Sequence, residues 1–328
     1  MKSPDYLLKI SDLSVRYFTP EGPLIAVNKV NLNIKKSEIV GIVGESGSGK
    51  STLAYATIGL LPQNSNTDGS IILDGENLLE KNEKEMQNVR GSRISMVFQD
   101  PMTSLNPLFR VKDQFLKVLS THKGMKRDDG IKFAVEKLEE VEMPDPSEVL
   151  RSFPFELSGG MQQRVMIAIA LSSDPQLIIA DEPTTAVDAT IQGQILRLLK
   201  KINVDRQLSI ILITHNLGIV AELCDTVIIM YAGAVFEKGP VEKIFKNPLH
   251  PYTISLLQSV PVIGKVNREQ DLPAIRGNVP DMSKLPVGCP FNPRCGRAIE
   301  KCKTINPPLA EVEREHFVAC HVATGEFV

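Results

Sequence analysis

The sequence predicts an α/β fold built from a mainly parallel sheet, an antiparallel β subdomain, a helical subdomain and a small, loop-rich C-terminal extension that contains cysteines. Three observations predict this fold. Four short apolar runs are typical of strands buried on both faces, alternation near the N-terminus is typical of strands with one solvated face, and cysteine and proline concentrate near the C-terminus. With 42% hydrophobic and 23% charged residues, the composition is that of a globular protein.

Alternation identifies the antiparallel part of the fold. Residues 7–18 alternate between apolar and polar side chains, and Val30, Leu32 and Ile34 are each followed by a polar residue. Such a period of two places the apolar side chains on one face of a strand. We therefore expect half-buried strands of an antiparallel sheet in this region.

Continuous apolar runs identify the parallel sheet. They occupy residues 39–43, 177–180, 210–213 and 227–230, and helix-length stretches separate most of them. This order predicts a parallel sheet that is covered on both faces. Residues 105–160 are richer in charge and helix formers and lack such a run, so we expect a helical insert there.

The C-terminal end differs in composition from the rest of the chain. Residues 260–328 hold 8 of the 22 prolines, and four of the five cysteines lie within the last 40 residues. We therefore predict one domain over residues 1–258, with the helical insert at about 105–160, and an extension over residues 259–328. The isolated Cys224 is expected to be a small buried apolar side chain.

Charge and hydropathy exclude several classes of protein. The 37 lysines and arginines nearly balance the 39 aspartates and glutamates, which gives a net charge of −2 and no global positive field for nucleic acid. No apolar run approaches the roughly 18 residues that a membrane span needs, and the N-terminus has no apolar signal core. We expect a cytosolic globular protein with no transmembrane segment.

Residues 44–51 read Gly-Glu-Ser-Gly-Ser-Gly-Lys-Ser and fit the phosphate-binding pattern G-x-x-x-x-G-K-[ST]. Glycines let backbone N–H groups surround phosphate oxygens, and the helix that follows presents its positive end. The alternative is a glycine-rich turn with an incidental lysine, but an apolar strand precedes the loop and a helix-prone stretch follows it. The pattern predicts a P-loop ATPase core with nucleotide contacts from Gly44, Ser46, Gly47, Ser48, Gly49, Lys50, Ser51 and Thr52. Lys50 is expected to reach the β and γ phosphates, and the Ser51 hydroxyl to bind Mg²⁺.

Two carboxylates, Asp181 and Glu182, end the buried run at residues 177–180. The carboxyl edge of an open parallel sheet is where such folds bind ligands. Asp181 suits the coordination sphere of Mg²⁺, and Glu182 could orient and deprotonate an attacking water. The alternative is a pair of solvated carboxylates at a strand end.

A third motif, Leu-Ser-Gly-Gly-Met-Gln-Gln-Arg over residues 157–164, leads into an apolar helix-prone stretch. Ser158 is placed to cap the helix, and Gly159 and Gly160 leave backbone N–H groups open towards an anion. An ordinary capped helix start is the alternative reading. The position of the motif, about twenty residues before Asp181, makes it distinctive.

Taken in this order, the motifs resemble those of the nucleotide-binding subunits of ATP-binding cassette transporters, over residues 5 to about 258. Residues 44–51 match the Walker A element, Asp181 and Glu182 match Walker B and its catalytic glutamate, and residues 157–162 match the family signature. The resemblance assigns further roles: Q-loop and Mg²⁺ contact to Gln99, switch histidine to His215, D-loop aspartate to Asp188, and adenine stacking to Tyr17, with Phe18 as the alternative. Met161 and Val187 depart from the usual signature glutamine and D-loop leucine, and neither change removes a phosphate-binding group.

The resemblance implies a two-chain mechanism. Two cassettes meet head to tail, and each ATP lies between the Lys50 loop of one subunit and Ser158, Gly159 and Gly160 of the other. Lys50, Mg²⁺, His215 and the opposite signature helix then share the γ-phosphate charge.

Three segments resemble a narrower subgroup, the ATPases of dipeptide, oligopeptide and nickel importers: residues 97–107, residues 157–168 and the His-Pro-Tyr-Thr sequence at 250–253. This resemblance implies a peptide importer. Its partners would be a second, similar ATPase subunit, two transmembrane permeases and an extracytoplasmic solute-binding protein. The chain would lie peripherally on the cytoplasmic face of the cell membrane.

The four clustered cysteines are Cys289, Cys295, Cys302 and Cys320. In a reducing compartment such a cluster predicts a metal or iron–sulfur site before disulfides. Structural zinc sites usually contain C-x₂₋₄-C pairs, which are missing here, whereas iron–sulfur clusters tolerate more varied spacing. Zinc and unligated thiols remain alternatives, and the subgroup resemblance implies a [4Fe–4S] cluster. His316 and His321 are close enough in sequence to replace a cysteine ligand, but we expect them at the surface.

Three other functions stay open at this point. The same subgroup includes nickel importers. A second possibility is a soluble cassette ATPase that acts on nucleic acid, although the single phosphate loop, the short insert and the net charge of −2 argue against it. The third is a regulatory protein in which the cysteine cluster, and not transport, is the function.

Overall fold

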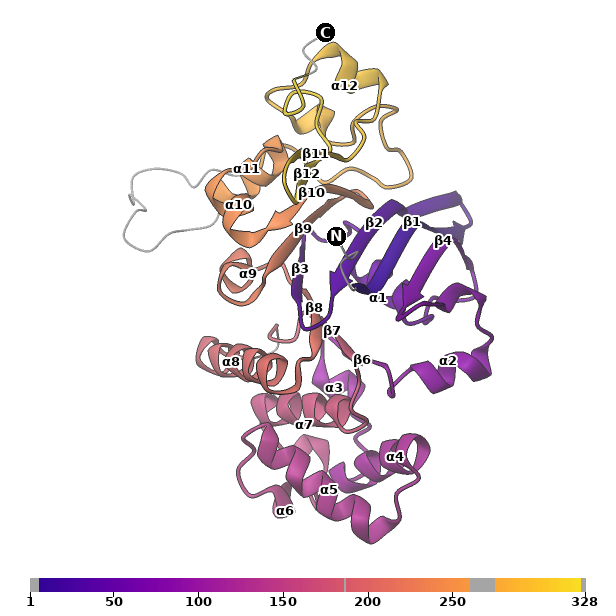
Figure 1. Cartoon of the computed structure of the whole chain (residues 1–328), viewed down its shortest axis with the longest axis vertical. Helices are drawn as coiled ribbons and strands as arrows, with labels where there is room; N and C mark the ends of the chain where they lie inside the picture. Colours follow the sequence, from indigo (N-terminus) through magenta and orange to yellow (C-terminus); the bar gives the residue numbers. More distant parts are fainter. Residues whose placement is uncertain (1–5, 186, 260–274, 326–328) are drawn as a thin grey trace. The chain divides into compact units, whose positions relative to one another are not determined.

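The computed structural model describes residues 6–185, 187–259 and 275–325. These residues form two compact units whose segments alternate along the chain. Unit 1 contains residues 35–39 and 80–213, and unit 2 contains residues 6–34, 40–79 and the described residues from 214 onwards. Figure 1 labels the helices and strands of both units.

Unit 1 contains parallel strands in the order β8-β7-β6. They are β6 (Ile94–Val97), β7 (Leu177–Asp181) and β8 (Ser209–Ile213). Every residue of β7 and β8 is buried, which explains their nearly continuous apolar sequences. The sequence analysis predicted β7 and β8 but missed β6, because this strand has only four residues and one of them is Ser95.

The helices of unit 1 surround a strongly apolar one, α7 (Gly159–Leu171), which packs against α3, α4 and α5. All residues of α7 from 162 to 168 are buried, as expected for a helix with neighbours on several sides. The other helices are α2 (Glu83–Val89), α3 (Pro101–Ser104), α4 (Val111–Lys123), α5 (Arg127–Glu140), α6 (Pro146–Val149), the 3₁₀ turn η2 (Pro154–Glu156) and α8 (Ala189–Arg206).

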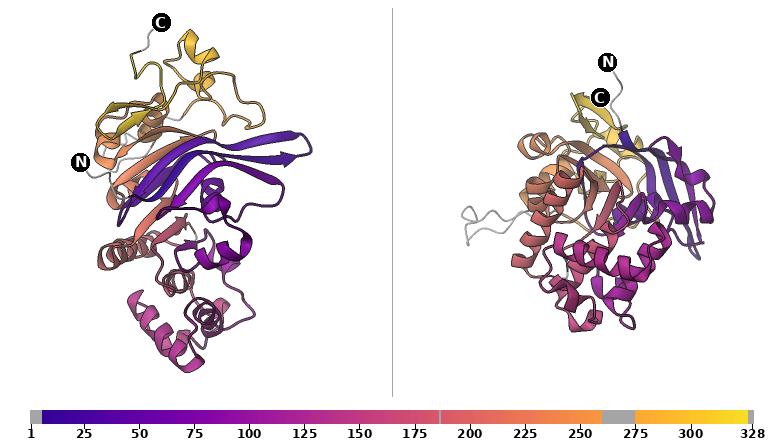
Figure 2. Two further views of the ribbon diagram at one scale, coloured as in Figure 1. Left: turned by 45° about the vertical axis from the view of Figure 1, so that its right-hand side comes forward. Right: turned by 60° about the horizontal axis from the view of Figure 1, so that its bottom comes forward.

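Unit 2 contains an antiparallel sheet in the order β2-β1-β4-β5. Its strands are β1 (Tyr6–Thr19), β2 (Gly22–Lys35), β4 (Ser65–Leu73) and β5 (Glu76–Asn77), and Figure 2 shows the long strands β1 and β2 side by side. Val30, Leu32 and Ile34 are buried and the residues between them are exposed. The predicted half-buried antiparallel strands are therefore confirmed.

A second set of strands in unit 2 follows the order β11-β12-β10-β9-β3. Here β3 (Ile39–Val43) pairs in parallel with β9 (Thr226–Tyr231), while β10 (Ala234–Pro240) pairs antiparallel with β9 and with β12 (His316–Val318). The edge strand is β11 (Ala310–Glu313). The helices are α1 (Lys50–Thr57), α9 (Leu217–Leu223), α10 (Val241–Lys246), α11 (Pro251–Gln258) and α12 (Glu300–Thr304), with 3₁₀ turns η1 (Leu78–Glu80) and η3 (Asn292–Arg294).

The C-terminal extension does more than the loop-rich sequence predicted, because its strands β11 and β12 continue the sheet beyond β10. The expectation that His316 and His321 lie at the surface is wrong, since both are buried. His316 Nε2 lies 2.8 Å from the buried Glu237 Oε1, and His321 Nε2 lies 3.0 Å from the Ile305 carbonyl oxygen. Residues 260–274 of the predicted extension lie outside the described residues.

The described elements confirm the predicted fold class: parallel strands, an antiparallel β sheet, a helical region and a cysteine-containing C-terminal segment. No helix in the described part of the chain combines the length and apolar character that a membrane span requires.

Candidate functional site

The predicted phosphate loop joins β3 to α1 in unit 2, and its backbone needs glycine. Gly47 and Gly49 have φ angles of 76° and 96°, which other residues adopt only with strain. A Cβ atom on Gly44 would collide with the carbonyl oxygen of Met230, and one on Gly49 with that of Ala26. The loop therefore takes a conformation that larger residues at these positions would prevent.

Lys50 is buried at the start of α1 and turns back over the loop. Its ammonium group donates to the carbonyl oxygens of Gly44 and Glu45, at 2.9 Å each, and lies 3.4 Å from Ser48 Oγ. The cation is thus held over the loop backbone, where a phosphate would need it.

The adenine-stacking assignment concerns two aromatic residues near the end of β1. Tyr17 is half-buried, and its hydroxyl lies 3.4 Å from Thr52 Oγ1, one turn into α1. Phe18 is 56% exposed. The structure therefore brings Tyr17 together with the end of the phosphate loop, while the stacking role itself stays a prediction.

The carboxylates at the end of β7 belong to unit 1. Asp181 is buried, and Glu182 has a left-handed backbone with φ of 45°. Glu182 Oε2 accepts hydrogen bonds from Gln99 Nε2 at 3.0 Å and from Thr185 Oγ1 at 2.9 Å. Gln99 and Glu182 are 83 residues apart in sequence, so the fold brings together two residues that the motifs named separately.

The signature residues begin α7, also in unit 1. Ser158 caps this helix, with Oγ accepting from the Met161 N–H at 3.4 Å, as the sequence predicted. A Cβ atom on Gly160 would approach Ile191 Cγ2 to 2.8 Å, so the glycine allows α8 to lie close. Asp188 caps α8 by accepting from the N–H groups of Thr190 and Ile191.

The predicted nucleotide residues are divided between the units. Gln99, Ser158, Gly159, Gly160, Asp181, Glu182 and Asp188 belong to unit 1, whereas Tyr17, the loop residues 44–52 and His215 belong to unit 2. His215 is exposed and precedes the N-cap of α9. The arrangement of all these residues around one ATP remains a prediction.

Sequence reasoning missed two contacts of the loop. Glu45, which the motif treats as a variable position, forms an ion pair with Arg294 and donates its N–H to the Tyr252 hydroxyl. Its only sequence signal was a charged residue inside the loop. Arg294 and Tyr252 lie more than 200 residues further along the chain, so only the fold could reveal the contacts.

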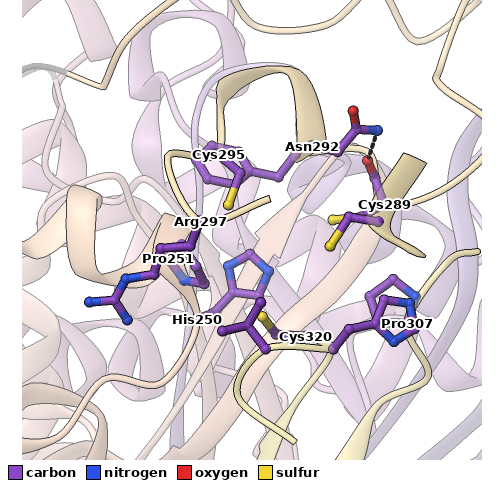
Figure 3. A pocket seen from close by; sticks show the side chains of 12 residues that line it. His250, Pro251, Cys289, Asn292, Cys295, Arg297, Pro307 and Cys320 are labelled. Atoms are coloured by element: carbon purple, nitrogen blue, oxygen red, sulfur yellow. Dashed lines mark hydrogen bonds between the residues drawn. The ribbon is translucent and has the colours of Figure 1, made fainter. Parts of the chain in front are cut away.

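The four C-terminal cysteines line one small cavity of about 10 Å³, which has room for about one water molecule. Figure 3 shows Cys289, Cys295 and Cys320 among the residues that line this cavity, together with His250. Cys302 completes the set of thiols. The structure thus brings together all four predicted cysteine ligands, from positions up to 31 residues apart.

Burial and neighbouring thiols govern the protonation of this cluster. Loss of solvent, followed by the charges of the other cysteines, raises the pKa of the Cys289 thiol to about 12. Burial also raises the pKa of Cys295 and of Cys320. Among the described residues, no group of three or more His, Cys, Asp or Glu side chains is arranged to hold a metal ion.

Two protein families match the chain. A family model described as ABC transporter matches residues 27–185, and one described as Oligopeptide/dipeptide transporter, C-terminal region, matches residues 236–302. The second match includes η3 and three of the four clustered cysteines.

Curated proteins are similar over nearly the whole chain. The oligopeptide transport ATP-binding protein OppD of Salmonella typhimurium is 46% identical, over 98% of this chain and 95% of its own length. The oligopeptide transport ATP-binding protein AppD of Bacillus subtilis is 45% identical, over 98% of each chain.

Solved structures are similar over about three quarters of the chain. The dimeric ATP-binding cassette MJ0796, in a post-hydrolysis state bound to ADP and phosphate, is 31% identical, with a TM-score of 0.64. The match covers 71% of this chain and 98% of that one. CbiO1 of Clostridium perfringens, part of an ABC transporter complex, is 30% identical, with a TM-score of 0.63, over 74% of this chain and 92% of its own.

Proposed function

Since the chain belongs to the ATP-binding cassette family of transport ATPases, we propose that it hydrolyses ATP within a cassette pair and thereby drives the import of peptides across the cytoplasmic membrane. The observation that carries this proposal is the similarity to oligopeptide transport ATP-binding proteins over 98% of the chain. It includes the C-terminal segment, which a cassette of another transporter class need not possess. This similarity favours transport over action on nucleic acid.

ATP is proposed to bind first through the phosphate loop. The backbone N–H groups of residues 46–52 and the ammonium of Lys50 would contact its phosphates, with Tyr17 against the adenine. Phosphate oxygens would then replace the carbonyls of Gly44 and Glu45 as partners of Lys50, which supports the assignment because the cation is already held over the loop.

Mg²⁺ is proposed to accompany the nucleotide. Ser51, Gln99 and Asp181 supply hydroxyl, amide and carboxylate oxygens, a donor set that suits this hard cation. When bound, Mg²⁺ would neutralise charge on the β and γ phosphates.

Glu182 is proposed as the base that takes a proton from the attacking water. The hydrogen bonds from Gln99 and Thr185 fix its carboxylate and support this role, because a base must be oriented before it can act. His215 would add a hydrogen bond to the γ-phosphate, where negative charge accumulates.

The second cassette is proposed to complete the site. Ser158, Gly159 and Gly160 begin α7 and would present its positive N-terminal end to the ATP of the partner subunit. Asp188, at the start of α8, would lie in the same subunit contact. The dimeric form of the similar cassette MJ0796 supports this arrangement.

The remaining partners follow from the same proposal. Two permeases would form the membrane path and an extracytoplasmic binding protein would select the solute, while this chain attaches peripherally at the cytoplasmic face.

A [4Fe–4S] cluster is proposed for the four cysteines. Its support is that four thiols line one buried cavity, a donor set that iron–sulfur clusters use. The cavity of about 10 Å³ is too small for the cluster as it stands, so the segment would have to open around it. Zinc is the alternative that a metal analysis would distinguish.

The transport proposal is tested by reconstituting the complete importer, with its permeases, paired ATPase subunit and binding protein, in proteoliposomes. We expect ATP hydrolysis that rises with added peptide and uptake of labelled peptide into the vesicles. Uptake of nickel without peptide would overturn the peptide assignment. An ATPase that responds to DNA or RNA, and not to peptide, would overturn the transport proposal.

A further inference from the structure

Arg294 connects the cysteine segment to the phosphate loop. Its guanidinium group donates to both carboxylate oxygens of Glu45, at 2.7 Å and 3.1 Å. Two further donors are used as well: Nη1 lies 3.2 Å from the Tyr231 hydroxyl, and Nε donates to the Arg276 carbonyl at 2.9 Å. The Arg294 side chain is only 6% exposed, so this two-pronged ion pair is largely protected from water and salt.

The carboxylate, the backbone N–H and the carbonyl of Glu45 each take part in a hydrogen bond or ion pair. Its carboxylate accepts from Arg294, its N–H donates to the Tyr252 hydroxyl at 3.0 Å, and its carbonyl accepts from Lys50 Nζ at 2.9 Å. The same carbonyl accepts from the Ser48 N–H at 3.2 Å. Because Glu45 bonds to Ser48 directly and holds Lys50 before ATP binds, a shift of its peptide would move loop residues that are meant to meet phosphate.

Charge gives the ion pair a second effect on the nucleotide. An unpaired carboxylate inside the phosphate loop would repel the polyphosphate of ATP. The hydrogen bonds that Arg294 donates to Glu45 raise the pKa of Arg294 above its already high value, so the guanidinium stays charged. Arg294 therefore both fixes the loop and offsets a negative charge beside the phosphates.

We propose that Arg294 and Tyr252 are positioning residues of the phosphate loop, and that Arg294 makes ATP binding depend on the state of the four-cysteine segment. This inference rests on the proposed role of the Lys50 loop in binding ATP.

The path from the cysteines to Arg294 is short. Arg294 ends η3, and the next residue is Cys295. The Cys289 carbonyl accepts from the N–H of Asn292 at 3.0 Å and from its side-chain amide at 2.7 Å, and the Arg294 N–H donates to the Phe291 carbonyl at 2.9 Å. A rearrangement around the thiols would therefore displace the turn that carries the guanidinium.

Aromatic packing makes this path rigid. The Phe291 ring lies 5.3 Å from the Tyr231 ring and 5.4 Å from the Tyr252 ring, centroid to centroid, and all three side chains are buried. Burial raises the pKa of Tyr252, so its hydroxyl stays neutral. The turn and the loop are thus connected by groups that have little room to move independently.

The first experiment measures ATP binding and hydrolysis by the full chain in its transporter complex, comparing Arg294→Ala with Arg314→Ala. Arg314 is an exposed arginine of the same segment and serves as the matched control. We expect Arg294→Ala to weaken ATP affinity and raise KM roughly tenfold, with kcat at saturating ATP within about twofold, because positioning affects binding of ground and transition states alike. Equal ATP affinities for the two variants would overturn the proposal. A lower kcat at unchanged KM would do the same, since that result describes a loss of folded protein.

Charge is separated from packing by Glu45→Gln. In this variant no carboxylate faces the phosphates, so we expect Arg294→Ala to weaken ATP binding less in the Glu45→Gln background than in the original chain. Strictly additive effects would contradict the ion-pair mechanism.

If Arg294→Ala does not fold, Arg294→Lys and Tyr252→Phe test the same contacts with smaller changes. Unchanged ATP affinity in both would overturn the proposal.

Dependence on the cysteine segment is tested by Cys295→Ser. We expect this change to weaken ATP binding in the original chain but to add nothing when Arg294 is already alanine. An equal, additive loss in both backgrounds would overturn the coupling. Lys50→Ala tests the proposed nucleotide site itself, and unchanged ATP affinity in this variant would refute that site. If Lys50→Ala weakens ATP binding but Arg294→Ala does not, only the role of Arg294 is refuted.

Discussion

Glu182 is the residue on which the proposed chemistry most directly depends. Its carboxylate is held by Gln99 and Thr185, which orient it without neutralising it. We predict that Glu182→Gln lowers the rate of ATP hydrolysis by roughly 10²–10⁴-fold, the usual contribution of a general base. The amide has nearly the same shape, so ATP affinity should stay close to that of the original chain. Steady-state hydrolysis and equilibrium ATP binding measure the two effects.

Glu222→Gln is a suitable control for this prediction, because Glu222 is an exposed carboxylate in α9. Hydrolysis by the Glu182 variant at the rate of the control would remove Glu182 from the mechanism. A comparable loss of ATP affinity would instead assign it a role in holding the nucleotide.

The glycines of the phosphate loop differ in what surrounds them. Gly47 and Gly49 both have positive φ, but a Cβ atom on Gly47 meets open space, whereas one on Gly49 collides with the Ala26 carbonyl. We predict that Gly47→Ala lowers the free energy of unfolding by about 1–2 kcal/mol through backbone strain alone. Gly49→Ala should cost about 1–3 kcal/mol more, because the overlap adds to the strain. Urea unfolding without nucleotide measures both variants, and equal losses would contradict the predicted collision.

At the level of single residues, the sequence predicted which side chains carry chemistry but not how they are held. The spacing of residues 44–51 and the pair at 181–182 were recognisable because phosphate binding demands particular residue types at fixed distances along the chain. The partners of Glu45 were not recognisable, since Tyr252 and Arg294 form no local pattern with it. His316 was placed wrongly because its neighbour Glu237 is 79 residues away, and only that partner makes its burial favourable.

Ion pairs join the helices of unit 1 at Asp174, in the turn that follows α7. Its carboxylate pairs with Lys123 at the end of α4, with Arg206 at the end of α8 at 3.1 Å and with Lys137 of α5 at 3.5 Å. Burial raises the pKa of Asp174, but the hydrogen bond from Lys123 and the three positive charges outweigh it and hold the pKa below its ordinary value.

We predict that Asp174→Asn lowers the free energy of unfolding by about 0.5–1 kcal/mol at pH 7, a modest loss because the carboxylate is half-exposed. The folded-state pKa is below the unfolded value of 3.8, so this stabilisation is complete above that value and disappears as the pH falls through the folded pKa. The difference from the original chain should therefore be constant from pH 7 to 5 and shrink below pH 4. Asp205→Asn, at an exposed position of α8, is the control. A difference that grows on acidification would refute the assignment.

Elements were predictable where burial leaves a clear pattern. Strands buried on both faces, such as β7 and β8, produced continuous apolar runs, and the half-buried β1 and β2 produced alternation. The sequence did not predict the short strand β6, nor β11 and β12, because three or four residues cannot display a periodic pattern of apolar side chains. β12 depends on pairing with β10, a contact across some 80 residues of sequence, and β11 in turn pairs with β12.

At the scale of the whole molecule, the chain crosses between its two compact units more than once, so the division of the structure does not follow sequence order. A composition change can reveal a boundary only where one unit ends and the next begins along the chain. The boundary proposed at residue 259 marks only a change in composition. The described residues beyond it belong to the same unit as the phosphate loop. The residues proposed to bind ATP likewise come from segments of both units.

The four-cysteine cluster belongs to the same unit as the phosphate loop, and its metal content can be measured directly. Three of the four cysteines are buried, Cys295 is half-buried, and the pKa of Cys289 is raised to about 12. A thiolate site therefore forms there only if a bound metal group displaces the protons. In the proposed [4Fe–4S] cluster each of the four thiolates would hold a different iron atom, whereas a single zinc ion would need all four thiolates around it.

We predict that the chain purified without oxygen contains about four irons and four acid-labile sulfides, the content of one [4Fe–4S] cluster. Cys295→Ser should lose most of the iron, and Cys224→Ser should keep it, because Cys224 lies outside the cavity. Metal analysis, sulfide assay and the visible absorption spectrum provide readouts that do not depend on ATPase activity. One zinc and no sulfide would make the segment a metal-stapled structural module. The coupling through Arg294 needs only an ordered turn beside Cys295, so a zinc-bound form would still hold the phosphate loop. Removal of either metal should therefore weaken ATP binding in the original chain but not in Arg294→Ala.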